Sequence, residues 1–310
     1  MKKSEIRKDY IQDKYVIIAP KRGKRPHTIA KKTEHENSDK KCVFCPNILE
    51  KNNTIEYQAR LKQDSKVWDV AVIKNKFPAV TLDNSKAYGI QEVVVETPKH
   101  LDELEDLSPT HIAKILEVYS QRTERISQNL KIEYILIFKN DGGRAGASIQ
   151  HAHSQIFATS FLPPHLFDKS QKVQAYKLQH GSCVYCDVIK KESRGKRLIY
   201  KDKYVITFTP YASVYNYEVW IMPIRHIDNV TMMNTDERAS FAEILKKILK
   251  KIGKLNMAYN YYFHQVINDE DQHLYMKIVP RGSVWAGVEI GSGIVINPIP
   301  PEEAAKYYKK

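Results

Sequence analysis

The sequence lacks a long hydrophobic run. None of its apolar stretches approaches the roughly 18 residues that a membrane-spanning helix needs. The first ten residues are charged and lead into no apolar segment, which argues against a secretory signal. We therefore expect a soluble, intracellular protein located in the cytoplasm.

Cysteine is scarce. The 310 residues contain four, arranged as two Cys-x-x-Cys pairs, Cys42 with Cys45 and Cys183 with Cys186. Four cysteines are too few to form a disulfide scaffold for a chain of this length. In a reducing compartment, pairs at this spacing are typical of metal or redox sites.

Acidic residues are outnumbered by basic ones. Lys and Arg number 49 against 36 Asp and Glu, which gives a formal net charge of +13. This balance predicts acidic partners: nucleic acid, anionic lipid or phosphate-bearing small molecules. Apolar residues at 42% and charged residues at 27% are ordinary values for a globular protein and exclude a disordered or fibrous chain. The length suffices for one large domain or two of ordinary size.

The chain repeats one order of features. The cysteine pairs begin two similar phrases, CVFCPNILEKN and CVYCDVIKKES, about half the chain apart. Each phrase is followed by two strands, a Pro-x-His or Pro-x-x-His stretch, a helix with an N-terminal capping signal (Ser108, Asn234), another strand, and an alternating strand that bears histidine. The expected strands are 67–74, 90–96, 134–140 and 151–156 in the first copy, and 204–208, 217–222, 261–268 and 273–278 in the second.

This recurrence favours an internal duplication. Any α+β chain shows some echoes of this kind, but here both the order and the approximate spacing recur. We therefore predict an α+β protein made of two tandem units, residues 1–170 and 171–310, each with an antiparallel sheet and helices.

Each copy adds two histidines at corresponding places, so the cysteine pairs become parts of two Cys2His2 sets. Any one of these histidines alone would more often be a core or surface side chain. Four soft or borderline donors in each set suit Zn2+ in a closed structural site, so two zinc ions are expected. The predicted ligands are Cys42, Cys45, His100 and His151 in the first copy, and Cys183, Cys186, His226 and His273 in the second.

A glycine-rich loop precedes the histidine-bearing strand of the first copy. A strand ends at Asn140, and the loop that follows has bare backbone N–H groups that can approach an anion. The next strand places His153 and Gln155 on the same face as His151, because side chains alternate along a strand. An imidazole beside a phosphate-binding loop can act as a nucleophile and form a phosphoramidate. The alternative is a strand histidine that is exposed to solvent.

The second copy lacks this chemistry. It keeps His273, but Tyr275 and Lys277 stand where His153 and Gln155 stand in the first copy, and the glycine-rich loop is missing. We therefore expect one active centre, in the first copy, and a metal site without a nucleophile in the second.

The segment from Asn140 to Gln155 resembles the galactose-1-phosphate uridylyltransferase branch of the histidine triad superfamily, which has a duplicated fold and the pattern Asn-x-Gly…Gly-(Ala/Cys)-Ser-x-x-His-x-His-x-Gln. The resemblance implies two histidine triad-like units. It also implies that His153 takes up a nucleoside monophosphate and that Gln155 hydrogen-bonds its phosphoryl oxygens. An amide cannot deliver a proton as a third histidine would, so the nucleotidyl-enzyme should wait for a phosphate acceptor. The residues of this segment implied to contact the nucleotide or its phosphate are Asn140, Gly146, Ala147, Ser148 and Gln155.

Three further segments are similar to family motifs. Arg22 and Arg25 stand in a stretch similar to Arg-x-x-Arg-Pro, whose arginines face the nucleotide phosphates; the alternative is a solvated basic loop. Asn75 begins the sequence NKFP, which is similar to the stretch that contacts the base and ribose. Glu289, in the sequence GVEI, is similar to the glutamate that holds the hexose.

The resemblance implies a nucleotidyltransferase that moves a nucleoside monophosphate, expected to be UMP, between a nucleotide sugar and a hexose 1-phosphate. The family usually has Asn-Asp where this chain has Asn75-Lys76, and the second cysteine pair and the tail after Glu289 are closer to ADP-glucose phosphorylase relatives. An ADP-sugar phosphorylase or adenylyltransferase is therefore the alternative within the superfamily. The resemblance makes a homodimer an expectation as well, and no membrane partner is expected.

A zinc-containing nucleic-acid-binding protein is the alternative from another class, because the charge of +13 and the 19 tyrosines would suit it. Compact finger modules have their ligands close together along the chain, whereas the ligands of each set here are spread over much of each copy. We therefore expect a nucleotide sugar and a sugar phosphate, rather than nucleic acid, as partners.

Overall fold

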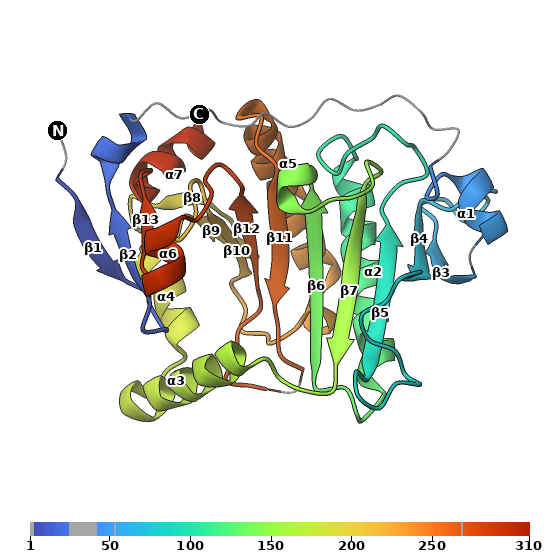
Figure 1. The fold of residues 1–310 in the computed structure, drawn as a ribbon, viewed down its shortest axis with the longest axis horizontal. Coiled ribbons are helices and arrows are strands. Elements are labelled where there is room, and N and C mark those ends of the chain that lie inside the picture. The colour runs from blue at the N-terminus through green and yellow to red at the C-terminus, as the bar shows by residue number, and fades with distance from the viewer. Residues whose placement is uncertain (1–2, 25–41, 53, 268) are drawn as a thin grey trace.

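The structure is a computed structural model that describes residues 3–24, 42–52, 54–267 and 269–310. Its main feature is a ten-stranded antiparallel sheet that runs across the molecule (Figure 1). The strands, in the order in which they lie side by side, are β3 Ile55–Ala59, β4 Val70–Lys74, β5 Gly89–Val95, β7 His153–Thr159, β6 Tyr134–Asp141, β11 Tyr259–His264, β12 Tyr275–Pro280, β10 Val219–Pro223, β9 Val205–Phe208 and β8 Leu198–Lys201.

The strand order repeats about the middle of this sheet. Strands β3, β4, β5, β7 and β6 of the first half of the chain run inwards from one edge, and β8, β9, β10, β12 and β11 of the second half run inwards from the other edge. β6 and β11 meet at the centre as an antiparallel pair, with Phe138 opposite Tyr262. The predicted α+β class with an internal duplication is confirmed. The division at residue 170 stays a prediction.

The predicted strands are present, with ends shifted by a few residues. The shift matters at the histidine-bearing strands, because β7 begins at His153 and β12 at Tyr275. Pairing with β5 ends where Val95 lies opposite His153, so His151 lies in the turn before β7. The prediction that His151 and His273 belong to these strands was therefore wrong by two residues.

Two long helices, α2 (Pro109–Ser127) and α5 (Thr235–Lys254), contact each other on one face of the sheet (Figure 1). The Ser108 side chain caps α2 by accepting a hydrogen bond from a backbone N–H of the first turn (3.1 Å). Asn234 and Glu237 form a capping box at the start of α5. Both predicted helix starts are confirmed, and each cap contributes on the order of 1 kcal/mol. None of the described helices is long and apolar enough to span a bilayer.

The main hydrophobic core lies between these two helices and the sheet. Apolar residues at helical spacing on α2 and α5 contact alternate residues of β6, β11 and β12. A smaller core lies on the opposite face of β4 and β5, where Leu49 of α1 (Pro46–Asn52) is buried with Trp68. The residues of the two long helices that enter the main core include Ile112, Ile115, Leu116, Tyr119, Phe241, Ile244, Leu245 and Ile248.

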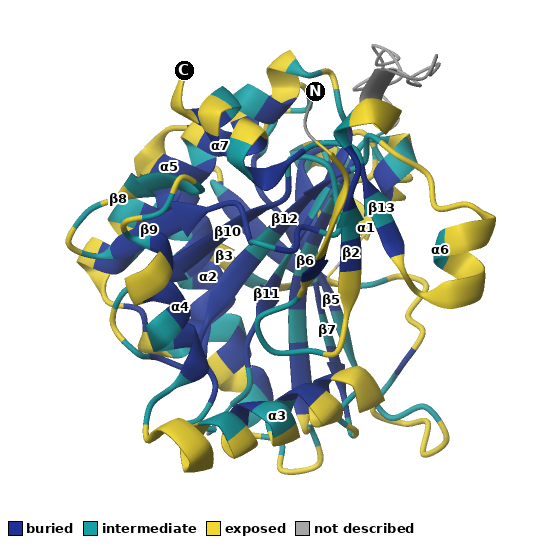
Figure 2. Cartoon of the chain, turned by 90° about the vertical axis from the view of Figure 1, so that its left-hand side faces the viewer, coloured by how far each residue is buried: buried dark blue, intermediate teal, exposed yellow. Residues whose placement is uncertain are grey.

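A three-stranded sheet brings together segments that are far apart in the sequence. β1 (Glu5–Lys8) pairs antiparallel with β2 (Tyr15–Ile18), and β2 pairs parallel with β13 (Val295–Asn297). Arg7 on β1 also forms an ion pair with Glu302 (3.0 Å). Figure 2 shows that the strands of the main sheet are largely buried, whereas α6 is exposed. The other helical segments are η1 Pro20–Lys24, η3 Gly143–Ala145, α3 Pro164–His180, α4 Val184–Glu192, η4 Val230–Met232, α6 Gly287–Ser292 and α7 Pro301–Lys309.

Candidate active site and metal centres

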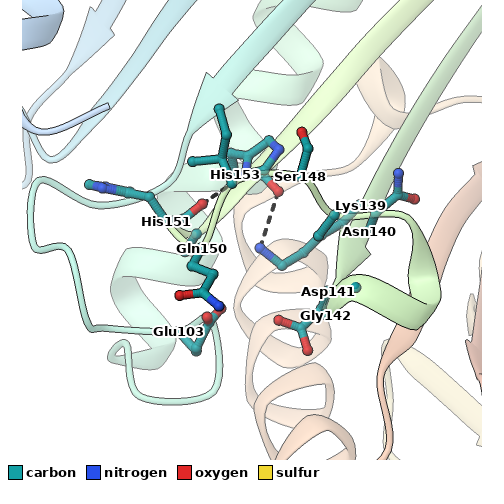
Figure 3. A pocket seen from close by; sticks show the side chains of 13 residues that line it. Glu103, Lys139, Asn140, Asp141, Gly142, Ser148, Gln150, His151 and His153 are labelled. Carbon is teal, nitrogen blue, oxygen red and sulfur yellow. Dashed lines mark hydrogen bonds between the residues drawn. The ribbon is translucent and has the colours of Figure 1, made fainter. Parts of the chain in front are cut away.

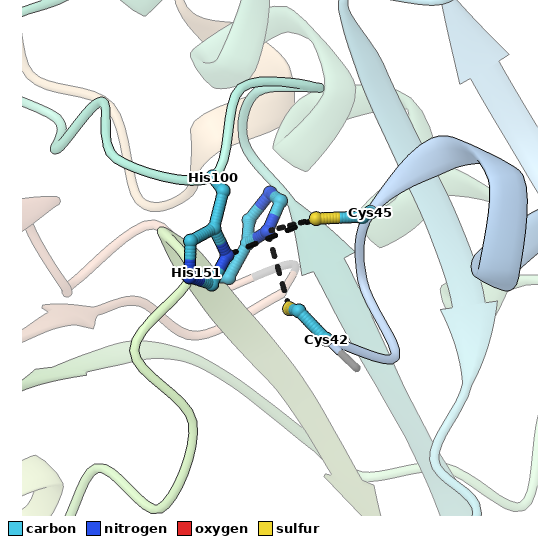
Figure 4. Close-up of side chains that lie close together, drawn as sticks. All are labelled: Cys42, Cys45, His100 and His151. Carbon is cyan, nitrogen blue, oxygen red and sulfur yellow. Dashed lines mark hydrogen bonds between the residues drawn. The ribbon is translucent and has the colours of Figure 1, made fainter. Parts of the chain in front are cut away.

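The first predicted ligand set comes together at one point (Figure 4). Cys42 and Cys45 lie just before α1. His100 follows β5, and His151 precedes β7. The four ligand atoms all lie within 4.8 Å of one another. Cys42 Sγ is 3.5 Å from His151 Nδ1, and Cys45 Sγ is 3.8 Å from the Nδ1 atom of each of the two histidines.

These separations fit a tetrahedral zinc ion. Zn–S bonds of about 2.3 Å and Zn–N bonds of about 2.0 Å place neighbouring sulfur and nitrogen ligands roughly 3.6 Å apart. The His151 ring is also oriented for this task. Its Nε2–H donates to the carbonyl of Thr97 (2.7 Å), which leaves Nδ1 as the ligand atom on the side of the thiols.

The second predicted set has the same arrangement, with its four ligand atoms within 4.8 Å of one another. Cys186 Sγ lies 3.3 Å from His226 Nδ1 and 3.8 Å from His273 Nδ1. The Nε2–H groups donate to backbone carbonyls, at 2.8 Å for His226 and 2.9 Å for His273. Hydrogen bonding to Cys186 holds the pKa of Cys183 well below its ordinary value, which favours a thiolate there. Each of the two sets can therefore hold one metal ion.

His153 is the first residue of β7 and lies beside the first metal centre. Its Nδ1–H donates to the carbonyl of His151 (2.7 Å), so Nε2 carries the free lone pair. The residue is only 8% exposed, and its ring centroid is 5.1 Å from that of Phe44. Burial, together with the nearby charge of Lys139, lowers the pKa of His153 below its ordinary value. A neutral imidazole with one free nitrogen is the form that can attack an electrophile.

A cavity of about 230 Å³ adjoins His153 (Figure 3). Its lining comes from the end of β6, the glycine-rich loop and the turn before β7. The loop needs glycine at positions 142 and 146, where φ is 82° and 90°, because residues that carry a side chain rarely adopt these backbone angles. Three of the predicted phosphate-contacting residues line this cavity, namely Asn140, Ala147 and Ser148.

A buried ion pair lies behind β7. Lys139 Nζ is 2.6 Å from Glu96 Oε2 and donates to the carbonyl of His153 at 3.2 Å, as Figure 3 shows for the second contact. Glu96 Oε1 accepts hydrogen bonds from the hydroxyl groups of Tyr119 and Tyr261. No sequence pattern indicates this ion pair, which ties the backbone of His153 to α2 and β11.

Gln155 lies two residues after His153, on the same face of β7. Its Oε1 accepts hydrogen bonds from Asn75 Nδ2 (3.3 Å) and from Gln91 Nε2 (3.1 Å). Asn75 and Gln155 were both predicted as site residues, whereas Gln91 was missed. Val93 lies opposite Gln155 in the pairing of β5 with β7, so Gln91, two residues earlier on β5, is a diagonal neighbour of Gln155 on the same face. This register cannot be derived from the sequence of either strand alone.

Asn140 connects the glycine-rich loop to the second half of the sheet. Its Oδ1 accepts a hydrogen bond from Asn260 Nδ2 (2.7 Å), which also donates to the carbonyl of Ala145 (2.8 Å). Arg281 in turn donates to Asn260 Oδ1 (3.0 Å). Asn260 and Arg281 were missed by the sequence reasoning. The pairing of β6 with β11 brings Asn260 to the loop, and the pairing of β11 with β12 brings Arg281, which follows β12.

The other predicted residues lie elsewhere. Arg25 falls outside the described residues. Arg22, in η1, lies near Glu289 on α6: a hydrogen bond from the Ala286 N–H and the charge of Arg22 both lower the pKa of Glu289. Figure 1 shows α6 and β13 on the opposite side of the molecule from β5 and β7. Within one chain, Arg22 and Glu289 are therefore not brought to His153.

In the second half of the chain, two packed side chains occupy the positions that correspond to His153 and Gln155. Tyr275 stands where His153 stands in the first half, stacks on Trp220 with ring centroids 4.4 Å apart, and accepts a hydrogen bond from Lys169 Nζ (2.5 Å). Lys277, in the place of Gln155, forms an ion pair with Glu218 (2.7 Å). The expectation of a single active centre, in the first half, stays a prediction.

Two family descriptions match the chain. Residues 1–163 match galactose-1-phosphate uridyl transferase, N-terminal domain, and residues 169–279 match the C-terminal domain of the same enzyme. The chain is 32% identical to ADP-glucose phosphorylase of Arabidopsis thaliana, over 99% of this chain and 92% of that protein. It is 29% identical to galactose-1-phosphate uridylyltransferase of Thermotoga maritima, over 99% of this chain and 98% of that protein.

Solved structures show the same likeness. The crystal structure of an ADP-glucose phosphorylase from Arabidopsis thaliana with bound ADP-glucose superposes with a TM-score of 0.87 and 30% identity, covering 99% of both chains. A structure of a uridylyltransferase superposes with a TM-score of 0.77 and 29% identity, covering 98% of this chain and 97% of the other. Both likenesses extend over the two halves of the duplicated sheet. The chain belongs to the galactose-1-phosphate uridylyltransferase family.

Proposed function

We propose that this protein is a nucleotidyltransferase that moves a nucleoside monophosphate between a nucleotide sugar and a hexose 1-phosphate through a covalent intermediate on His153. The observation that carries the proposal is the state of this imidazole: Nδ1–H is bound to the carbonyl of His151 (2.7 Å), and Nε2 is left free next to the cavity that the glycine-rich loop lines. The substrate class comes from relatives that are named galactose-1-phosphate uridylyltransferase.

The reaction proceeds in two displacements at one phosphorus atom. In the first, the lone pair of His153 Nε2 forms a bond to the α-phosphorus, and the sugar 1-phosphate leaves with the electron pair of the broken P–O bond. In the second, a phosphate oxygen of the acceptor attacks the same phosphorus, and the electron pair of the P–N bond returns to Nε2. Each leaving group is stable without a proton, so Gln155 only has to donate hydrogen bonds to the phosphoryl oxygens as charge develops.

The two Cys2His2 sets are proposed as zinc sites. Four protein ligands close the coordination shell, so each bound ion serves as a structural cross-link rather than a substrate site. In the first half, the ion would join the segment before α1 to the turn before β7. Holding His151 in this way also holds the carbonyl group that orients His153.

Arg22 and Glu289 are proposed to act on substrate in a homodimer, in which a second copy supplies them to His153. The support is their position away from His153 in one chain, together with the resemblance that gives both residues substrate contacts. Mixing His153→Ala and Glu289→Ala chains under conditions that exchange subunits should restore activity to about a quarter of the wild-type level, because half of the dimers carry one intact site. No restoration in a mixture that does exchange subunits would contradict the shared site.

An ADP-sugar phosphorylase is the second candidate, with AMP as the transferred group and inorganic phosphate as the acceptor. Two observations favour it. The chain is 32% identical to the ADP-glucose phosphorylase of Arabidopsis thaliana. The crystal structure of an ADP-glucose phosphorylase from this organism superposes with a TM-score of 0.87. In addition, Lys76 follows Asn75 where the uridylyltransferases usually have aspartate.

A substrate panel tests both candidates. UDP-glucose and ADP-glucose are each incubated with galactose 1-phosphate or with inorganic phosphate, and the products are separated by ion-exchange chromatography. Turnover with UDP-glucose and galactose 1-phosphate supports the first candidate, and turnover with ADP-glucose and phosphate supports the second. In either case His153→Ala should lose activity. Absence of turnover in all four mixtures, with salt-dependent binding of DNA or RNA, would refute the nucleotidyltransferase proposal.

A further inference from the structure

The amide of Gln155 has two ends of similar shape and opposite chemistry. Its NH2 group can donate hydrogen bonds to phosphoryl oxygens, whereas its carbonyl oxygen would repel them. Rotating the amide by half a turn exchanges the two ends, so its neighbours decide which end faces the substrate. The contacts around Gln155 settle this orientation.

Gln91 on β5 provides the first constraint. The backbone N–H of Ala79 donates to Gln91 Oε1 (2.9 Å), and a backbone N–H can only donate, so this end of the Gln91 amide is its oxygen. The other end is therefore the NH2 group. It lies 3.1 Å from Gln155 Oε1 and donates to it.

Asn75 provides the second constraint in the same way. The backbone N–H of Phe77 donates to Asn75 Oδ1 (2.9 Å), so Nδ2 is the group that donates to Gln155 Oε1 (3.3 Å). Two donors thus converge on one carbonyl oxygen and use both of its lone pairs. The NH2 group of Gln155 is left free for the phosphoryl oxygens.

We propose that Gln91 is a positioning residue that fixes the Gln155 amide with its NH2 group toward the transferred phosphoryl group. This inference rests on the proposed function and adds a residue to it. Gln91 is itself held at both ends, since its backbone carbonyl accepts from the Asn75 N–H (2.9 Å) and its side chain accepts from the Ala79 N–H. The orientation of Gln155 is therefore coupled to the segment between Asn75 and Ala79.

Gln91→Glu reverses this constraint with almost no change of shape. The carboxylate still accepts from the Ala79 N–H, but its second oxygen now faces Gln155 as a strong acceptor. Gln155 should rotate to donate its NH2 group to this oxygen, which turns its own carbonyl toward the phosphoryl group. We expect kcat to fall about 100-fold, the loss seen when a donor to a developing oxyanion is removed. Gln91→Met removes one donor and leaves Asn75 in place, so a loss of about 10-fold or less is expected.

A double-mutant cycle separates positioning from mere structural damage. kcat and KM are measured for wild type, Gln91→Glu, Gln91→Met and Gln155→Ala, and for each Gln91 variant combined with Gln155→Ala. If Gln91 acts through Gln155, its variants cost activity only when Gln155 is present. Equal losses in both backgrounds would overturn the inference. Gln58→Glu, which adds the same charge on the exposed part of β3, is the matched control and should leave kcat unchanged.

The same experiment keeps this inference apart from the proposed function. Nucleotidyl transfer that survives in His153→Ala would refute the proposed function itself. Transfer that requires His153 but is unaffected in Gln91→Glu would refute only the positioning role. Thermal unfolding of each variant shows whether it folds, and should Gln91→Glu fail to fold, the cycle with Gln91→Met decides the question.

Discussion

The buried ion pair behind the active strand gives a quantitative prediction. Lys139 and Glu96 are 1% and 0% exposed, with Nζ and Oε2 2.6 Å apart. Lys139→Met keeps much of the side-chain volume but leaves the Glu96 carboxylate buried. Within the described part of the chain, its remaining donors are then the hydroxyl groups of Tyr119 and Tyr261. Breaking a buried pair in this way costs about 3–5 kcal/mol, because an uncompensated charge remains in the interior.

Adding Glu96→Gln to the Lys139→Met chain should recover more than half of this loss, since the neutral amide oxygen can still accept from the two tyrosines. The free energy of unfolding is measured by urea denaturation, followed by the fluorescence of the three tryptophans. Lys247→Met is the control: its partner Glu243 is 3.8 Å away, both side chains are exposed, and the loss should stay below about 1 kcal/mol. A loss below about 1 kcal/mol in Lys139→Met, or no recovery in the double variant, would refute the reasoning.

Three other changes test separate parts of the structure. Cys42→Ser should lower the zinc content from two ions per chain to one, measured by inductively coupled plasma mass spectrometry; an unchanged content would refute the first centre. Gly146→Ala should slow nucleotidyl transfer, because φ of 90° strains any other residue; full activity would show that the loop tolerates the change. Burial alone would raise the pKa of Glu302, but hydrogen bonds from Arg7 and Arg197 outweigh this effect and lower the pKa from 4.5 to about 2. The ionised carboxylate therefore stabilises the fold above pH 4.5 and loses this effect as the pH falls towards 2. Glu302→Gln should be less stable than wild type at pH 7, with a difference that shrinks across this range in acid denaturation; a constant difference would contradict the ion pair.

The sequence predicted the parts of this protein that are repeated or local. The duplication was visible because each half carries its own cysteine pair and histidines, so weak signals supported one another. The capping signals at Ser108 and Asn234 marked the starts of α2 and α5, since a cap depends on residues within one turn. The pairing of His153 with Gln155 on one strand face followed from alternation alone.

The parts that the sequence did not predict depend on which strands lie side by side. Gln91 contacts Gln155, and Asn260 contacts Asn140, only because of the registers of β5 with β7 and of β6 with β11. The pairing of β2 with β13 joins segments from the two ends of the described chain, and no local pattern signals such a contact. The position of Glu289 away from His153 has the same origin. Glu289 lies on α6, which directly precedes β13 in the chain, and β13 is placed by its pairing with β2.

Detection of a nucleotidyl group on His153 is the most direct test of the central claim. The enzyme is incubated with UDP-glucose or ADP-glucose carrying labelled α-phosphorus, without an acceptor, and the modified peptide is identified by mass spectrometry. We predict about one acid-labile label per chain on His153, released when galactose 1-phosphate or inorganic phosphate is added and absent in His153→Ala. Turnover by an enzyme that never carries the label, or by the His153→Ala chain, would contradict the account.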